Sequence, residues 1–410
     1  MSIIDGLIPA TDALRIILQD AVPQTSEAVN LRQANGRVLK SDLNALRTQP
    51  PFDASAMDGY AVRQQDISKI PASLNIIGQS AAGHPFQGAV GNNEAVRIFT
   101  GAQIPDQADT IIIQENTRSD GKQVHILKGN SPGKFIRHAG LDFREGECLL
   151  QSGRVMDPQS IALAASMNHP QLEVWKKPVA AILATGDELV MPGNLLAQGE
   201  IIASNSFALA SIVEDAGGEA LDMGIAKDTV ASLIEHVQSA IHKGADMIIT
   251  IGGASVGDHD LVLPAMQKIG FEFEFSKIAM RPGKPFLFAK NNSTGKSIRM
   301  LGLAGNPVSS IIAGQVFVRP LVHAMAGLPE EQSRPLPAVL GGDLKANDER
   351  QEYMRVLIDI DDDGTLIATP FETQDSSMLA NLNRADALLV RRVHAPAANT
   401  GDSCEVVLLR

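Results

Sequence analysis

Between about residues 177 and 329, short buried strands alternate with helices, and this alternation limits the possible folds more than any other feature. The apolar runs Val179–Leu183 and Met247–Ile251 predict strands buried on both faces. The segments Ser206–Ala216 and Val230–Ile241 predict helices that end near glycines. Strands alternating with helices favour a mostly parallel sheet covered on both faces. Ligands bind such sheets beyond the carboxyl ends of the strands, so a site is expected there.

The same region continues with three shorter elements and a long helix. Leu261–Ile269 predicts a helix, and Phe286–Phe288 and Met300–Leu303 predict strands. Val308–Met325 predicts a long helix, in which Pro320 predicts a kink. The region as a whole is therefore typical of one α/β domain.

The chain on either side of this region has a different pattern. Apolar residues at helical spacing predict a helix over Thr11–Ala21, with Thr11 as its N-cap. From about residue 45 to 140, short apolar runs separated by Gly, Pro, Asn and Asp predict a small β module inserted into a helical unit. The proline-rich stretch Pro329–Pro337 predicts a linker. Residues from about 338 to 410 predict a small β domain.

The composition argues against several classes of protein. With 44% hydrophobic and 20% charged residues, the chain has the make-up of a globular protein. The formal net charge is −12 and 4% of the residues are aromatic, so we expect no nucleic-acid ligand. Two distant cysteines, Cys148 and Cys404, fit a reducing compartment better than a disulfide framework. We find no signal peptide and no stretch of membrane-spanning length, so we expect a cytoplasmic protein without a membrane partner.

A polar turn follows the first buried strand of the α/β region. Thr185 and Gly186 bring a hydroxyl and backbone N–H groups to the expected sheet edge. The adjacent acids Asp187 and Glu188 could hold a magnesium ion. A solvated turn with two ordinary acids explains the same residues equally well.

A glycine-rich loop, TIGGASVGDHD at residues 250–260, follows the second buried strand. Its three glycines allow the backbone to approach a phosphate closely. Thr250 and Ser255 supply hydroxyls, and Asp258 and Asp260 place two carboxylates near one loop, as a divalent cation requires. The alternative, a plain glycine-rich connector, explains the density of polar groups less well.

Two further loops could bind anions. In RPGKP, prolines and a glycine hold the cations Arg281 and Lys284 in a stiff turn that suits an oxyanion or a phosphate. In GLAGNPVS, at residues 302–309, a strand ends at Asn306 and Pro307 begins the long helix, whose N-terminal amides would favour an anion. The alternatives are a surface turn with solvated charges and an ordinary helix cap with proline at the first position.

The stretch PPFDASAMDGYAV at residues 50–62 is a proline-stiffened loop with two acids. No reaction follows from it, and turn chemistry also explains Thr100 and Asp142 when each is considered singly. Taken together and in one order, however, this stretch, TGDEL, TIGGASVGDHD, RPGKPF and GLAGNPVS resemble the molybdopterin molybdenumtransferase family, whose relatives include the E domain of gephyrin. The similarity runs from about residue 5 to the C-terminus.

The resemblance implies both an activity and an assembly. Adenylylated molybdopterin and molybdate would give molybdenum cofactor, with release of AMP and assistance by Mg²⁺. Each active site of a homodimer would lie in a cleft between the α/β domain of one subunit and other domains of its partner. The adenylyltransferase that makes the activated pterin and apo-molybdoenzymes become candidate partners.

The resemblance also implies four domains. These are an elongated helical domain (1–44 and 141–176), the inserted β module (45–140), the α/β molybdopterin-binding domain (177–329) and a β-barrel-like C-terminal domain (330–410).

Functional residues can be carried over to the matching positions. The acids and hydroxyls expected to be catalytic are Asp58, Thr100, Asp142, Glu188, Asp228, Asp258 and Asp260. The expected magnesium ligands among them are Glu188, Asp228, Asp258 and Asp260. The residues expected to bind the pterin substrate or molybdate are Thr185, Gly186, Thr250, Gly252, Gly253, Ser255, Arg281, Lys284, Gly305, Asn306, Pro307, Ser309, Ser376 and Ser377.

The chain departs from the family pattern at two positions, and two other functions stay open. The family usually has lysine where Arg281 stands and proline where Ala304 stands; arginine keeps the charge but changes its shape. A molybdopterin adenylyltransferase would share the α/β domain, although the β module and the C-terminal domain favour the transferase. A non-catalytic scaffold of the same fold is the other alternative, which the full set of loop acids disfavours.

Overall fold

The computed structural model describes residues 6–253, 261–293, 295–329 and 335–409. The chain divides into two compact units. The first, which we call unit 1, comprises Met1–Glu27, Gly36–Val38 and Val174–Arg410. The second, unit 2, comprises Ala28–Asn35 and Leu39–Glu173.

The centre of unit 1 is a sheet of four parallel strands continued by an antiparallel hairpin. Across the sheet the order is β17 (Glu219–Ala226), β14 (Val179–Thr185), β18 (Met247–Ile251), β21 (Ile298–Leu303), β20 (Pro285–Asn291) and β19 (Glu272–Arg281). The first four are parallel, as predicted for an α/β domain, whereas β20 is antiparallel to both β21 and β19. The short strand β1 (Ile8–Pro9) pairs in parallel with β19.

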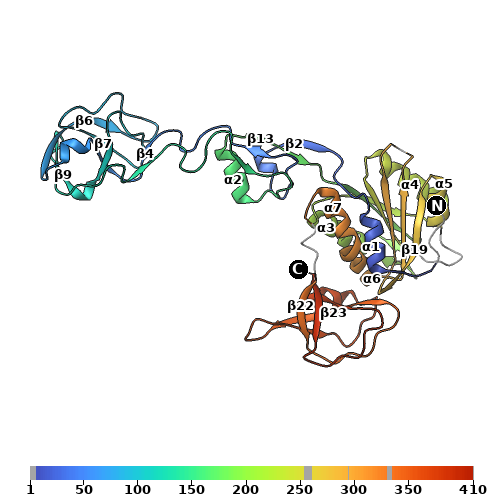
Figure 1. Ribbon diagram of the computed structural model, residues 1–410. Helices are drawn as coiled ribbons and strands as arrows, with labels where there is room; N and C mark the ends of the chain where they lie inside the picture. The colour runs from blue at the N-terminus through green and yellow to red at the C-terminus, as the bar shows by residue number, and fades with distance from the viewer. Residues whose placement is uncertain (1–5, 254–260, 294, 330–334, 410) are drawn as a thin grey trace. The chain divides into compact units, whose positions relative to one another are not determined.

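Helices cover both faces of this sheet (Figure 1). On one face lie α1 (Ala10–Leu18), α3 (Asn205–Asp215), α6 (Pro307–Ala313) and α7 (Arg319–Ala326); on the other lie α4 (Val230–His242) and α5 (Val262–Lys268). In α4 the buried residues Leu233, Val237 and Ala240 recur at three- and four-residue spacing, so one face of the helix packs on the sheet.

The N-terminal helix differs from its prediction in both start and location. Helix α1 begins at Ala10, directly after Pro9, and Thr11 is not its cap. It ends at Leu18, because the next residue, Gln19, has ψ of 125°, outside the helical range, and Asp20 then takes a left-handed conformation with φ of 59°. Ala13 and Ile17 are buried in the core of unit 1. The expectation that residues 1–44 all belong to an elongated helical domain is therefore wrong for this helix.

The long helix predicted over Val308–Met325 is one helical run of three parts. Between α6 and α7 lies a π-helical turn, Gly314–Val318, which ends two residues before the predicted kink site, Pro320. Proline lacks the N–H that would bond four residues back, so a widened turn fits ahead of it.

This helical run also corrects the prediction that no stretch of the chain is long and apolar enough to span a membrane. Pro307–Ala326 has 20 residues, and its most apolar window has a mean hydropathy of 1.3, enough to cross a membrane by length and composition alone. That window is 67% buried inside the protein, which is the environment of a core helix.

The C-terminal part of unit 1 is a closed five-stranded barrel with one short helix. Its elements are β22 (Leu336–Leu340), β23 (Gln351–Ile360), β24 (Leu366–Pro370), α8 (Leu379–Arg384), β25 (Ala387–Arg391) and β26 (Ser403–Leu408). The ring closes because β23 pairs with β24 and β25, while β22 pairs with β24 and β26, and β25 with β26. Strand β22 begins at Leu336, inside the stretch predicted as a linker. The barrel joins the central sheet where β19 pairs in parallel with β23.

Unit 2 contains a six-stranded sheet that corresponds to the predicted β module. Its order is β8 (Thr110–Ile113), β5 (Gly59–Val62), β7 (Glu94–Ile98), β6 (Ala72–Ser80), β10 (Gln123–Ile126) and β9 (Thr117–Ser119). Its apolar core includes Val62, Leu74 and Ile112.

The remainder of unit 2 is less helical than predicted. Among its described residues α2 (Pro158–Ser166) is the one α-helix, and Asp157 caps it by accepting from Ser160 N. Its described residues also form short 3₁₀ turns, at Leu31–Gln33, Gln64–Ile67 and Gln114–Asn116. Two-stranded ladders pair β11 (Ile136–Arg137) with β4 (Ala54–Ser55), β12 (Cys148–Leu150) with β3 (Leu43–Asn44), and β13 (Gln171–Trp175) with β2 (Ser26–Asn30). Strands β3, β4, β11 and β12 have two or three residues each, too few to show a two-residue periodicity in the sequence.

Candidate functional site

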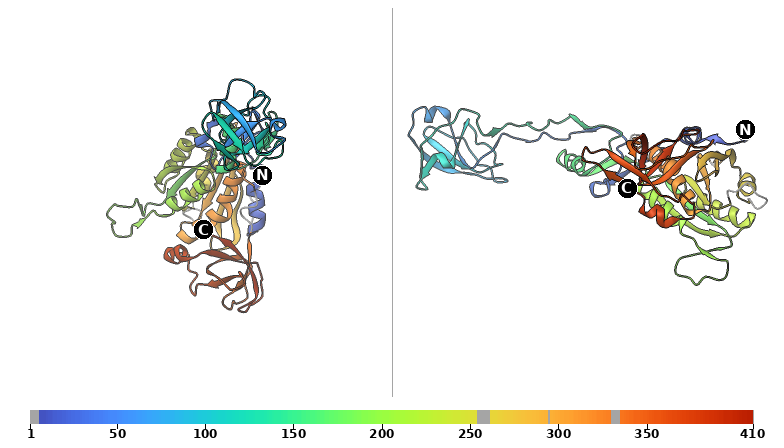
Figure 2. Two further views of the ribbon diagram at one scale, coloured as in Figure 1. Left: turned by 90° about the vertical axis from the view of Figure 1, so that its left-hand side faces the viewer. Right: turned by 90° about the horizontal axis from the view of Figure 1, so that it is seen from below.

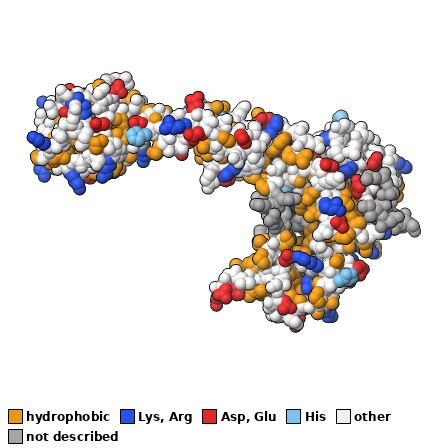
Figure 3. All heavy atoms as spheres, viewed as in Figure 1, with side chains coloured by type: hydrophobic (Ala, Val, Ile, Leu, Met, Phe, Trp, Pro, Cys, Tyr) orange, Lys and Arg blue, Asp and Glu red, His pale blue; other side chains and the backbone are white. Residues whose placement is uncertain are grey.

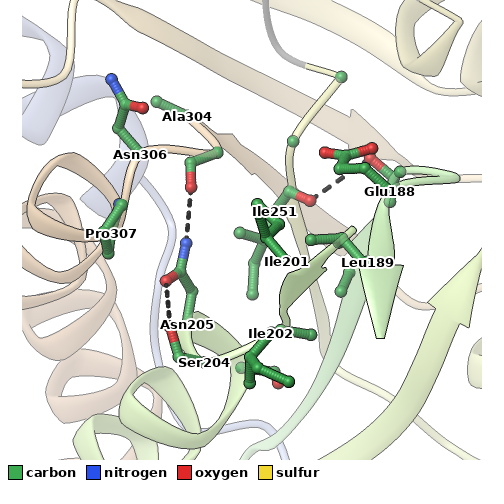
Figure 4. A pocket seen from close by; sticks show the side chains of 18 of the residues that line it. Glu188, Leu189, Ile201, Ile202, Ser204, Asn205, Ile251, Ala304, Asn306 and Pro307 are labelled. Carbon is green, nitrogen blue, oxygen red and sulfur yellow. Dashed lines mark hydrogen bonds between the residues drawn. The ribbon is translucent and has the colours of Figure 1, made fainter. Parts of the chain in front are cut away.

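A pocket of about 760 Å³ opens at the carboxyl ends of the parallel strands β14, β18 and β21 (Figure 4). This is the edge at which open α/β sheets bind ligands. Ten of the predicted site residues line it: Thr185, Gly186, Glu188, Asp228, Gly252, Gly253, Gly305, Asn306, Pro307 and Ser377. Charged side chains of both signs are interspersed over the face seen in Figure 3.

The loop after β14 places the carboxylate of Glu188 close to the turn at Gly186. Gly186 has φ of +148°, and a Cβ there would lie 2.5 Å from a carboxylate oxygen of Glu188. The hydroxyl of Thr185 donates to the carbonyl of Ile251 at 3.4 Å, which ties this loop to β18. The turn therefore places Glu188 in the pocket.

A second carboxylate, Asp228, comes from the loop after β17. Asp187 N donates to Asp228 Oδ2 at 3.4 Å, and Asp228 N donates to Asp187 Oδ1 at 3.2 Å. These reciprocal bonds hold the two loops together. Among the described residues no three His, Cys, Asp or Glu side chains form a metal-binding group. Two carboxylates nevertheless fit Mg²⁺, which commonly takes one or two of them together with substrate phosphates and water.

The backbone conformation of the loop after β18 requires glycine at two positions, 252 and 253. Gly252 has φ of +92° and Gly253 has φ of +64°. A Cβ on Gly252 would lie 2.6 Å from the carbonyl oxygen of Thr185, a backbone atom that cannot swing away. Gly252 N donates to Leu303 O at 3.0 Å, and a Cβ added at Gly305 would lie 3.8 Å from the Cα of Gly252. The three strand-end loops therefore touch, which exposes their backbone groups to a ligand.

Polar contacts fix the loop between β21 and α6. Asn205 Nδ2 donates to Gly305 O at 2.7 Å. Asn306 does not cap α6 with its side chain; its Nδ2 donates to Ser376 Oγ at 3.0 Å. Val308 N donates to Ser376 O at 3.1 Å, so the barrel loop meets the start of the helix and places Ser377 in the pocket lining.

One wall of the pocket is formed by two short strands that the sequence does not predict. The two-residue strands β15 (Leu189–Val190) and β16 (Ile201–Ile202) pair in parallel, and Leu189, Ile201 and Ile202 line the pocket. The segment between them extends away from the rest of unit 1 (Figure 2), and Leu195 within it is 97% exposed. An apolar wall opposite polar loops suits a ligand with a flat ring and a charged end.

The other predicted residues of unit 1 lie outside the lining. Thr250 is fully buried on β18, and its hydroxyl has no partner among the described residues. Ser309 is buried in α6. Arg281 is ion-paired with acids of the barrel, while Lys284 is exposed beside Pro285, which lines the pocket. The predictions for Ser255, Asp258 and Asp260 fall outside the described residues.

In unit 2 the structure brings two predicted residues into contact. Asp58 Oδ1 accepts from both the backbone N and the hydroxyl of Thr100, each at 2.8 Å. These bonds, with the backbone bond as the larger cause, hold the pKa of Asp58 below its ordinary value. Asp142 is exposed, and its backbone N donates to Gln49 O at 3.0 Å.

The substitution Thr100→Ala is expected to raise the pKa of Asp58 part of the way to the ordinary value of 3.8, because the backbone bond remains. A carboxylate with a lowered pKa stabilises the fold above its ordinary pKa and loses that contribution as pH falls through the lowered value. Titration of the carboxyl carbons by NMR measures the shift. Asp343, held in the same way by Thr400, is a control within the same spectrum. An unchanged Asp58 titration would contradict the role of the hydroxyl.

Three family models match the chain in order. The MoeA N-terminal region (domain I and II) matches residues 8–168. A probable molybdopterin binding domain matches residues 181–324. The MoeA C-terminal region (domain IV) matches residues 337–409.

Whole-chain relatives agree with these matches. The molybdopterin molybdenumtransferase of Nostoc sp. is 34% identical over 394 residues, covering 95% of this chain and 88% of that protein. The molybdopterin molybdenumtransferase of Haemophilus influenzae is 31% identical over 394 residues, covering 96% of each. The crystal structure of the molybdopterin biosynthesis moea protein from Pyrococcus horikosii superposes with a TM-score of 0.84 at 28% identity, covering 99% of this chain and 100% of that one.

Proposed function

The chain belongs to the molybdopterin molybdenumtransferase family, and on this premise we propose that the pocket of unit 1 is where adenylylated molybdopterin meets molybdate and AMP is released. The observation that carries the proposal is the contact of three glycine-lined strand ends, with two carboxylates and an apolar wall around one pocket. The apolar wall of Leu189, Ile201 and Ile202 suits a ring, and the exposed loop amides suit phosphate.

Glu188 and Asp228 would hold Mg²⁺. Both carboxylates line the pocket, and the reciprocal bonds between Asp187 and Asp228 keep the second one in place. The ion would offset charge on the phosphates of the substrate. Asp258 and Asp260, which follow the glycine loop in the sequence, complete the proposed ligand set.

Lys284 would provide the positive charge for molybdate. Its side chain is exposed, and the next residue, Pro285, lines the pocket. Molybdopterin carries its own dithiolene sulfurs, so the chain need only orient the two anions and hold them close together. Fixed cations and amides then stabilise the charge that develops as AMP leaves.

We further propose that the protein acts as a homodimer in the cytoplasm. Asp58, Thr100 and Asp142 of one subunit would complete the active site of the other. Asp58 supports this role because two hydrogen bonds fix a partly exposed, ionised carboxylate in one orientation. The adenylyltransferase and apo-molybdoenzymes are the proposed protein partners, since one supplies the substrate and the others take the product.

Reconstitution tests this function directly. The protein, given adenylylated molybdopterin, molybdate and Mg²⁺, should release AMP and yield a cofactor that activates an apo-molybdoenzyme. The same protein given molybdopterin, ATP and Mg²⁺ should not form the adenylylated pterin; product there would favour the adenylyltransferase. Binding of the adenylylated pterin without any release of AMP would instead favour a scaffold.

A further inference from the structure

Arg281 differs from Lys284, the other cation of its loop, in being paired with acids. Its Nη2 is ion-paired with Asp348, and its Nη1 lies 3.6 Å from Glu352 Oε1. Lys284 forms no ion pair with a described residue. We infer that Arg281 does not bind the oxyanion but clamps the barrel to the central sheet, and so positions Lys284 and Ser377 at the pocket. The inference rests on the proposed function for the role of that pocket.

The backbone places Arg281 at the junction of sheet and barrel. It is the last residue of β19, and it pairs with Glu352 of β23 in the parallel ladder that joins the two. The turn to β20 begins immediately after it and ends at Pro285 in the pocket lining. Ile278 N donates to Lys284 O at 3.1 Å, which closes this turn. A shift of Arg281 relative to the barrel would therefore move the turn that carries Lys284.

Asp348, the acid that Arg281 contacts, is itself held in place by other residues of the barrel. Asp348 Oδ2 also accepts from Arg350 Nη2 at 2.9 Å, and its Oδ1 accepts from Arg350 N at 3.0 Å. The bond from the Arg350 side chain is the largest cause that holds the pKa of Asp348 below its ordinary value. The carbonyl of Asp348 accepts from His394 N at 2.8 Å. Asp348 is thus held ionised and in place by the barrel.

The charges around Arg281 leave little attraction for an oxyanion. Arg281 and Arg350 face Asp348 and Glu352, so the cations and anions of this group balance. The planar guanidinium can contact two carboxylates at once, whereas the point charge of a lysine on a flexible stem cannot bridge them in the same way. The arginine at this position therefore fits a bridge between acids better than it fits a ligand of molybdate.

The barrel contributes to the pocket directly, which gives the clamp a functional consequence. Ser377 lines the pocket, and the neighbouring Ser376 bonds the side chain of Asn306 and the backbone N of Val308. The clamp and these serine contacts are two separate attachments of the barrel beside one pocket. Loosening the clamp should move Ser377 and Lys284 together.

The test compares Arg281→Gln with Asp348→Asn, which lies outside the pocket lining. If Arg281 is a clamp, both variants should raise the KM for molybdate, on the order of tenfold for Arg281→Gln, because small misplacements of a binding group are costly. The rise for Asp348→Asn should be no larger, because Arg281 keeps its contact with Glu352 there. The double variant should be no worse than the more damaging of the two single variants, in KM and in melting temperature. If Arg281 binds the oxyanion directly, Asp348→Asn should instead lower KM by releasing the cation, and that result would overturn the inference.

Two further variants complete the experiment. Arg281→Lys keeps the charge but not the bridge, so a clamp predicts an intermediate rise in KM, whereas direct binding predicts the wild-type value. Arg392→Gln breaks the surface pair with Glu405 elsewhere on the barrel and is the matched control, with no change expected.

Failure of the clamp and failure of the proposed function can be told apart. Lys284→Gln should raise the KM for molybdate, and an unchanged KM there would count against the proposed role of Lys284. The melting temperatures of the Arg281 and Asp348 variants need no substrate. Additive losses in the double variant would refute the clamp even if the assay for AMP release gave no signal.

Discussion

Gly252→Ala is expected to reduce AMP release by about a hundredfold or more, because a displacement of about 1 Å near the reacting groups can cost that much. The added Cβ would lie 2.6 Å from the carbonyl oxygen of Thr185, so the two strand-end loops would have to move apart. That movement would open the pocket where its three loops touch. Steady-state kinetics and a binding titration with the adenylylated pterin measure the effect.

Gly244→Ala is the matched control for this substitution. Gly244 has φ of +90°, against +92° for Gly252, but no atom lies within 4 Å of the Cβ it would gain. Both variants carry the same backbone cost, on the order of 1–2 kcal/mol in unfolding free energy. Only Gly252→Ala adds the steric clash, so it should lose further stability together with its activity. Equal activity in the two variants would show that the close approach of the loops is unimportant.

Glu188→Gln is expected to lower the rate of AMP release on the order of a hundredfold, the usual effect of removing one group that stabilises transition-state charge. Glutamine keeps the size of the side chain but removes the negative charge proposed to hold Mg²⁺. The loss should be partly offset at high Mg²⁺ concentration, because weakened metal binding can be compensated by mass action. A series of Mg²⁺ titrations on both proteins measures this.

Glu214→Gln is the control for charge. Glu214 is an exposed residue of α3 that does not line the pocket, so its substitution makes the same change in net charge elsewhere. We expect wild-type kinetics from it. If Glu188→Gln also kept wild-type rates at low Mg²⁺, the assignment of this carboxylate to the metal would be lost.

The parts of the fold that could be predicted from sequence are those with strong local patterns. Strands β14 and β18 are apolar runs that end next to a threonine and a glycine, and both strands lie where predicted. Strand β17 was missed because Asp222 and Gly224 interrupt its apolar pattern. The wall of β15 and β16 was missed because a two-residue strand has no periodicity to detect.

Long-range contacts account for the remaining differences. The pairing of Arg281 with Asp348 joins residues 67 positions apart, and nothing in the local sequence of RPGKP indicates it. The same holds for α1, whose apolar stripe could have packed on any neighbour but packs in the core of unit 1. Local patterns predict an element and its buried face, whereas the partner of that face depends on the tertiary fold.

Strand β1, the first described strand, pairs with β19, which lies about 270 residues later in the sequence. Ile8 of β1 pairs with Ile278, and α1 directly after it packs among residues of the sheet and the long helix. During synthesis at roughly 5–20 residues per second, the N-terminal segment therefore waits many seconds, with its apolar stripe uncovered, until those residues leave the ribosome. Nearly all of unit 2 emerges earlier and can fold during that interval. The segment of β1 and α1 is thus synthesised before unit 2 but packs only after β19 has been made, and its exposed apolar residues are the kind of surface that chaperones bind.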